Sequence, residues 1–194
     1  MSQPLPLRIA LVLAPLPGLN AAPYVGQLYL AAALLRAGHD VRAFDLAATA
    51  DGAARDRALT ALCAWKPAIV GLSIVTLNAL ESYALLPTLR ASGALLLAGG
   101  AHSSACPREV LEQGFDAVLR GEGEDAFVAL AEGVQRGERR RGDLGFHSQL
   151  GLDALPFAHE GLPAFRHEHA GAHRCALANE LVATLTWTET TRTP

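Results

Sequence analysis

The chain has almost no lysine, and this scarcity excludes two common nucleotide and phosphate chemistries. Lys66 is its only lysine. A P-loop needs a lysine at the end of its glycine-rich turn to reach the bound phosphates. A phospho-acceptor receiver domain needs a lysine after its fifth strand and an aspartate after its third, where this chain has Ser73. Neither class fits the sequence.

Cysteine is also scarce. Cys63, Cys106 and Cys175 are odd in number, far apart and without Cys-x-x-Cys spacing. Such a set forms neither a disulfide framework nor an iron–sulfur site. We therefore expect reduced thiols and a cytoplasmic location.

The chain has no strong charge of either sign and no long apolar run. Its formal net charge is −3 and its pI is near 6.1, which argues against a nucleic-acid or anionic-membrane surface. No apolar run approaches the roughly 20 residues that a membrane span needs. The first apolar run, residues 7–14, is short and is followed at once by Pro15 and Pro17, so we interpret it as a buried strand rather than a signal peptide.

What is present is an alternation of apolar runs with amphipathic segments. The expected strands are residues 7–14, 39–45, 68–73, 94–98 and 116–119, and the expected helices are 24–37, 51–65, 78–90, 107–113 and 121–136. This alternation predicts a doubly wound, five-stranded parallel sheet in the flavodoxin-like order 2-1-3-4-5. Residues 1–136 would form this α/β domain. Residues 137–194, which contain no long periodic segment, would be a linker and an irregular extension.

The central run, residues 69–78, indicates where a ligand would bind. It is β-branched and apolar without alternation, as in a strand covered on both faces, and it ends in small and hydroxylic residues. In an open α/β sheet a ligand lies beyond the carboxyl ends of the strands, where strand order reverses. Three such ends are rich in small residues: 73–78, 99–102 and 121–124. Because glycine lets a backbone approach a ligand closely, these three turns predict a slot for a large ligand.

Two familiar ligand loops are missing. The loop after the first strand, residues 14–23, contains no Gly-x-Gly-x-x-Gly, and its two early prolines remove amide donors that a pyrophosphate would need. It also lacks the serines and threonines of a flavodoxin phosphate loop. An α/β domain that binds a flavin or another nucleotide-like ligand nevertheless remains an alternative.

Five segments together resemble a known family. They are residues 26–41, 70–76, 98–102, 120–124 and the linker-like 152–157. In this order and spacing, the stretch 7–157 is similar to the N-terminal cobalamin-binding domain of cobalamin-dependent radical S-adenosylmethionine enzymes. The resemblance implies cobalamin as the cofactor.

The resemblance also implies roles for individual residues. Ser73 and Thr76 would face the nucleotide tail of cobalamin, and Gly99 and Gly100 would let that tail pass between the strands. The remaining implied neighbours are Gly121, Glu122, Gly123 and Glu124 along the same cavity, and Val75, Asn78 and His102 near the corrin ring or its amides. Relatives with Asp-x-His-x-x-Gly after the first strand supply a histidine to cobalt; residues 14–23 contain no histidine. The resemblance therefore implies base-off cobalamin without a protein histidine on the metal.

The chain departs from the family in one respect. A radical enzyme of this kind holds its four-iron cluster with Cys-x-x-x-Cys-x-x-Cys, and only Cys175 follows the linker here. The sequence thus provides no complete active site. A stand-alone cobalamin carrier, a component that serves a separate radical or methyl-transfer chain, and a truncated remnant all remain open at this point, as does the oligomeric state.

Two further clusters invite a chemical interpretation. His167, His169, His173 and Cys175 contain zinc-type ligands, but their spacing matches no familiar zinc module, so we interpret them as a solvated tail. Glu122 and Glu124 have the composition of a catalytic carboxylate pair; we expect them instead to begin a helix and to bind ligand amides.

Overall fold

A computed structural model of the chain describes residues 5–16, 25–48, 51–138 and 141–146. The predicted tail cluster, the loop 17–23 and the linker-like segment 152–157 lie outside the described residues. Within the described part, no helix is long and apolar enough to cross a bilayer.

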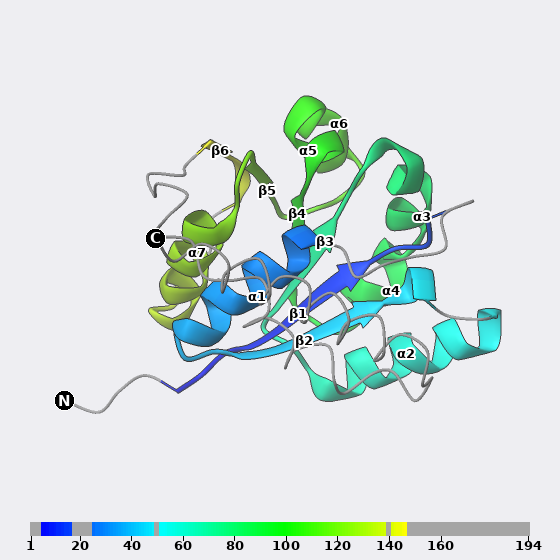
Figure 1. Cartoon of the computed structure of the whole chain (residues 1–194), viewed down its shortest axis with the longest axis horizontal. Coiled ribbons are helices and arrows are strands. Elements are labelled where there is room, and N and C mark those ends of the chain that lie inside the picture. The colour runs from blue at the N-terminus through cyan, green and yellow to red at the C-terminus, as the bar shows by residue number, and fades with distance from the viewer. Residues whose placement is uncertain (1–4, 17–24, 49–50, 139–140, 147–194) are drawn as a thin grey trace, which may run out of the picture.

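The described residues form a six-stranded parallel sheet (Figure 1). The strands are β1 (Arg8–Leu13), β2 (Asp40–Asp45), β3 (Ile69–Ser73), β4 (Leu95–Gly99), β5 (Ala117–Arg120) and β6 (Gly142–Phe146). Their order, β2-β1-β3-β4-β5-β6, confirms the predicted flavodoxin-like arrangement. The direction of order reverses between β1 and β3, as expected.

The sixth strand corrects the predicted number of strands. β6 pairs in parallel with β5, placing Gly142 beside Ala117 and Phe146 beside Arg120. This strand could not be predicted from the sequence, because Gly142–Phe146 contains two glycines and an aspartate and has no apolar run. β6 lies within the range 137–194 that we expected to be a linker and an extension.

Helices cover both faces of the sheet in two layers (Figure 1). One face packs against α1 (Val25–Arg36) and α7 (Glu124–Gln135), which also contact each other. The other face packs against α2 (Gly52–Trp65), α3 (Ala79–Ala84), α4 (Leu86–Arg90) and α6 (Pro107–Glu112). The remaining described elements are the 3₁₀ turns η1 (Leu46–Ala48) and η2 (Thr76–Asn78) and the five-residue helix α5 (Ala101–Ala105).

The strands are buried on both faces, which explains their continuous apolar sequence. All five residues of β3 are buried, and alternate residues of β1 and β4 enter the two opposite cores. Leu11 and Leu97 face α1 and α7, whereas Val12 and Leu96 face the opposite layer. Burial of this kind contributes about 1.5–3 kcal/mol for each large apolar side chain.

Individual residues explain where α2 begins and why the expected helix 78–90 is divided. Asp51 caps α2 as predicted, because its carboxylate accepts a hydrogen bond from the Ala54 amide at 2.7 Å. The expected helix 78–90 is instead divided into α3 and α4. Pro87 has no amide hydrogen to bond back to Tyr83, so the α-helical pattern is interrupted there.

His39 is a buried histidine at the start of the second strand and predicts a pH-dependent stability. It is 5% exposed, and neither ring nitrogen has a partner among the described residues. Burial lowers its pKa below 6.5, and the Glu132 carboxylate opposes the shift only in part. Above about pH 6.5 the ring is neutral in both states; as pH falls from there, the unfolded chain binds a proton that the folded chain resists.

We therefore expect the melting temperature to fall by a few degrees as pH is lowered from 6.5 toward the reduced pKa of His39. A His39→Leu variant keeps the packing without a titratable ring, so this part of the pH profile should flatten. Thermal melts at several pH values test this. An unchanged profile in the variant would assign the effect to other groups.

Candidate functional site

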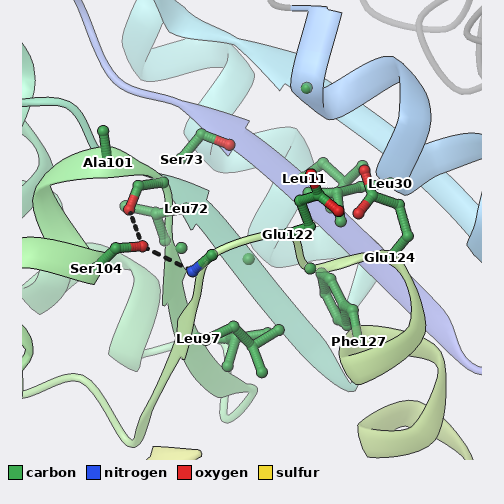
Figure 2. Close-up of a pocket in the computed structure, with 17 residues that line it drawn as sticks. Leu11, Leu30, Leu72, Ser73, Leu97, Ala101, Ser104, Glu122, Glu124 and Phe127 are labelled. Carbon is green, nitrogen blue, oxygen red and sulfur yellow. Dashed lines mark hydrogen bonds between the residues drawn. The ribbon is translucent and has the colours of Figure 1, made fainter. Parts of the chain in front are cut away.

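A cavity of about 350 Å³ lies at the carboxyl edge of the sheet, on the face covered by α1 and α7 (Figure 2). Its walls come from the ends of β3, β4 and β5 and from the turns that follow them. The lining residues are Leu11, Gly26, Leu30, Gly71, Leu72, Ser73, Leu97, Gly99, Gly100, Ala101, Ser104, Leu119, Gly121, Glu122, Gly123, Glu124 and Phe127. The cavity therefore lies where the topology predicted a ligand.

The inner part of the cavity is apolar. Leu11, Leu97 and Leu119 line it from three strands, and the ring of Phe127 lies over Gly71. A Cβ atom at Gly71 would meet Phe127 Cε1 at 2.9 Å, so only glycine lets the ring lie this close to β3. Such a surface suits a flat apolar group rather than a phosphate.

Two glycines at the end of β4 shape the opposite wall in different ways. A Cβ at Gly99 would approach only the Leu119 carbonyl oxygen, at 3.9 Å, so this position faces open space. Gly100 is different, because its φ is +97° and a Cβ there would lie 2.6 Å from the Ile74 carbonyl oxygen. Gly99 leaves room for a ligand, whereas Gly100 lets the turns after β3 and β4 touch.

Ser104 joins two of the glycine turns (Figure 2). Its hydroxyl donates to the Gly100 carbonyl oxygen at 2.9 Å and accepts from the Gly121 amide at 2.9 Å. One side chain thus fixes the turn after β4 against the turn after β5, and the cavity wall is preorganised between them.

Ser73 is held at the end of β3 by a residue of α1. Gln27 is 1% exposed, and its Nε2 donates to the Ser73 hydroxyl at 3.1 Å. The other amide atom, Gln27 Oε1, is buried without a partner among the described residues. Gln27 does not line the cavity itself, but its hydrogen bond fixes the Ser73 hydroxyl, which does.

Two glutamates bring negative charge to the rim of the cavity. Glu122 is exposed, and Glu124, at the start of α7, is partly buried with Oε2 unpartnered among the described residues. Burial raises the pKa of Glu124, and the carboxylates of Glu122 and Asp125 raise it further, although backbone amides act against them. Both side chains offer acceptor oxygens to amide or hydroxyl donors.

Glu124 should lower the stability of the ligand-free protein at neutral pH. The pKa of Glu124 in the folded state lies above 4.5, so protonation of this carboxylate favours the folded state. This contribution to the free energy of unfolding is complete below pH 4.5 and is lost as pH rises through the raised pKa. We expect Glu124→Gln to raise the melting temperature at pH 7 by roughly 1–3 °C, a small effect because solvent screens the site. The gain should vanish below about pH 4.5.

The matched control is Glu112→Gln, which changes an exposed glutamate paired with Arg108 on α6. It should leave the melting temperature within about 1 °C at neutral pH. A Glu124→Gln variant that melts no higher than the control would contradict the charge-burial argument.

The structure brings seven of the eleven candidate residues to the cavity: Ser73, Gly99, Gly100, Gly121, Glu122, Gly123 and Glu124. The other four, Val75, Thr76, Asn78 and His102, do not line it. Asn78 is fully buried within its own turn, where Oδ1 accepts from the Val75 amide and Nδ2 donates to the Ser73 carbonyl oxygen. His102 contacts Tyr83 and Thr76 instead. The ligand roles of all eleven remain predictions.

Sequence reasoning missed the lining residues that come from helices and strand interiors. Leu30 reaches the cavity from α1, Phe127 from α7, and Ser104 from a five-residue helix that we did not predict. One signal was available: Gly71 interrupts an otherwise branched strand, and glycine inside a strand often marks a close approach.

A family model matches most of the part of the chain that forms the cavity. The model of the family described as the B12 binding domain matches residues 20–131. That range contains almost the whole cavity wall, from α1 through the start of α7; only Leu11 precedes it. No curated protein sequence matches the chain significantly.

A solved structure shares the fold. It is the radical S-adenosylmethionine methyltransferase TsrM from Kitasatospora setae, with tryptophan substrate and the analogue aza-SAM bound. The match has a TM-score of 0.60 and 23% identity over 68% of this chain. The match covers 26% of the methyltransferase chain, so this chain spans about a quarter of that protein.

Proposed function

Because the chain belongs to the B12-binding domain family and its cofactor is cobalamin, we propose that it holds cobalamin with the nucleotide tail in the cavity between β3, β4 and α7. The observation that supports this most is the cavity itself. It is mostly apolar and is bounded by glycines at the carboxyl edge of the sheet. The tail ends in a flat benzimidazole, which such a surface suits.

The residues present fit this cofactor on two counts. First, Gly99 lines the wall without positive φ, and a Cβ there would meet only the Leu119 carbonyl oxygen, so its lack of a side chain leaves room in the cavity. Second, Glu124 lines the cavity, and its Oε2 lacks a partner among the described residues. Cobalamin carries many amide donors, and unpaired buried acceptors are the groups that such donors satisfy.

We further propose that the cofactor is bound base-off without a protein histidine on cobalt. Of the described histidines, His39 is buried near the amino end of β2, and His102 is engaged with Tyr83. Neither lines the cavity. The protein's part would be to separate the benzimidazole from the metal by enclosing it, while Gln27 holds the Ser73 hydroxyl in place at the cavity wall.

A loading experiment tests the tail pocket. The purified full chain is incubated with cobalamin or with cobinamide, a corrinoid that lacks the nucleotide tail, and is then desalted. We expect the protein to retain cobalamin at least about tenfold better, equivalent to about 1.4 kcal/mol. Equal retention of both would contradict a tail pocket, and preferential retention of a flavin would favour the nucleotide-ligand alternative.

A separate measurement tests whether a nitrogen ligand is bound to cobalt. Electron paramagnetic resonance of the bound cobalt(II) form resolves splitting from an axial nitrogen when one is present. We expect that splitting to be absent in the loaded protein. Its presence would show that the base or a histidine remains on cobalt.

We also propose that the loaded chain serves a separate radical S-adenosylmethionine or methyl-transfer protein. Two large apolar side chains near the carboxyl edge support a contact there: Leu77 is 64% exposed and Leu80 is 82% exposed. Exposed apolar side chains that lie together, three residues apart in sequence, are the kind of surface that a protein partner covers. A Leu77→Asp, Leu80→Asp variant should retain cobalamin but lose stimulation of the partner's methyl transfer. Full stimulation by the variant would contradict this surface.

A further inference from the structure

A second cluster of reactive side chains lies outside the cavity, at the junction of α5 and α6. His102, Cys106 and Glu109 each offer one ligand atom, and these atoms lie within 4.8 Å of one another. None of the three lines the cobalamin cavity. From this geometry we propose that His102, Cys106 and Glu109 form a binding site for a divalent zinc-type cation, a property separate from cobalamin binding.

The spacing between two of the ligand atoms already suits a metal. His102 Nε2 lies 3.5 Å from Glu109 Oε1. Two ligands bound to a tetrahedral zinc ion at 2.0–2.2 Å lie about 3.3–3.6 Å apart. The Cys106 sulfur lies within 4.8 Å of one ring nitrogen of His102 and of one carboxylate oxygen of Glu109, and it would bind the cation as a thiolate.

His102 has a neighbour that can orient its ring for a metal. Its Nδ1 lies 3.4 Å from the Thr76 hydroxyl. In the tautomer that leaves Nε2 free for a metal, Nδ1–H donates to this hydroxyl. An outer hydrogen bond of this kind fixes the ring tautomer in metal sites.

Tyr83 competes with the metal. Its hydroxyl oxygen is 3.0 Å from His102 Nε2 and 2.9 Å from Glu109 Oε1, so it bridges the two atoms that the cation would bridge. Metal binding requires the hydroxyl to withdraw from Nε2. Removing this hydroxyl should therefore strengthen metal binding.

The ligand types select the ion. A nitrogen, a sulfur and a single carboxylate favour zinc or cobalt(II) over magnesium and calcium, which prefer oxygen ligands. Three protein ligands leave a fourth position for water.

The test uses the full chain without cobalamin, so its outcome is independent of the cofactor proposal. Because His167, His169, His173 and Cys175 are also potential ligands, the parent for all measurements carries alanine at the three histidines and serine at the cysteine. Zinc is titrated against a chromophoric chelator, and cobalt(II) is added separately to record its absorption. We expect one zinc per chain and a thiolate-to-cobalt charge-transfer band.

Three variants locate the site. Cys106→Ser and His102→Gln should each weaken zinc binding at least about tenfold, and Cys106→Ser should abolish the charge-transfer band. Cys63→Ser, which changes the partly buried thiol on α2, is the matched control and should bind zinc like the parent. Tyr83→Phe should bind zinc more tightly than the parent. Unchanged affinity in Cys106→Ser and His102→Gln, with native circular dichroism, would overturn the proposal.

Discussion

A Gly99→Leu variant loses cobalamin binding by at least about 100-fold, equivalent to about 2.7 kcal/mol, while its fold remains as stable as that of the parent; this is the result we expect. Gly99 ends β4, has no positive φ, and faces open space apart from the Leu119 carbonyl oxygen at 3.9 Å. A leucine there occupies the volume proposed for the nucleotide tail without straining the backbone.

Gly52→Leu is the matched control for that experiment. Gly52 begins α2, an added side chain there meets nothing within 4 Å, and it lies far along the chain from the cavity wall. Equilibrium dialysis with cobalamin, paired with thermal melts, separates binding from folding. Retention of cobalamin by a well-folded Gly99→Leu protein would place the tail elsewhere.

Gly100→Ala should have the largest effect on stability, a loss of about 2–4 kcal/mol in the free energy of unfolding. Its φ of +97° and ψ of 178° belong to a region that residues with a Cβ avoid. The added Cβ would also lie 2.6 Å from the Ile74 carbonyl oxygen, which accepts the His102 amide. The turns after β3 and β4 must therefore separate.

A Gly93→Ala variant separates the cost of the backbone conformation from the cost of the contact with Ile74. Gly93 also has a positive φ, of +76°, but nothing lies within 4 Å of a Cβ there. This variant should cost about 1 kcal/mol, from backbone conformation alone. Urea unfolding of both variants measures the difference, and equal losses would show that contact with Ile74 adds nothing.

Much of the fold could be predicted because the chain's local signals agree with its topology. β3 is apolar without alternation, which only a strand covered on both faces tolerates, and Asp51 caps the helix that it was expected to begin. Five strands and their order follow from this pattern. β6 does not, because an edge strand such as Gly142–Phe146 needs little apolar sequence once β5 offers it a hydrogen-bonding partner.

The site could be predicted where it depends on turns and not where it depends on packing. The glycines after β4 and β5 are visible in the sequence, and the structure brings them to one cavity. The placement of Phe127 over Gly71 depends on how α7 lies on the sheet. The Ser104 bridge likewise requires two turns, 17 residues apart in sequence, to meet in space.

The direction of β6 has a consequence for any covalent attachment. β6 runs parallel to β5, and Phe146 pairs with Arg120, the residue just before the Gly121 turn. The described chain therefore ends at the same edge of the sheet as the Gly121 wall of the cavity. A substrate or protein tethered beside Phe146 would begin close to the proposed cobalamin site, with no need to pass around the molecule.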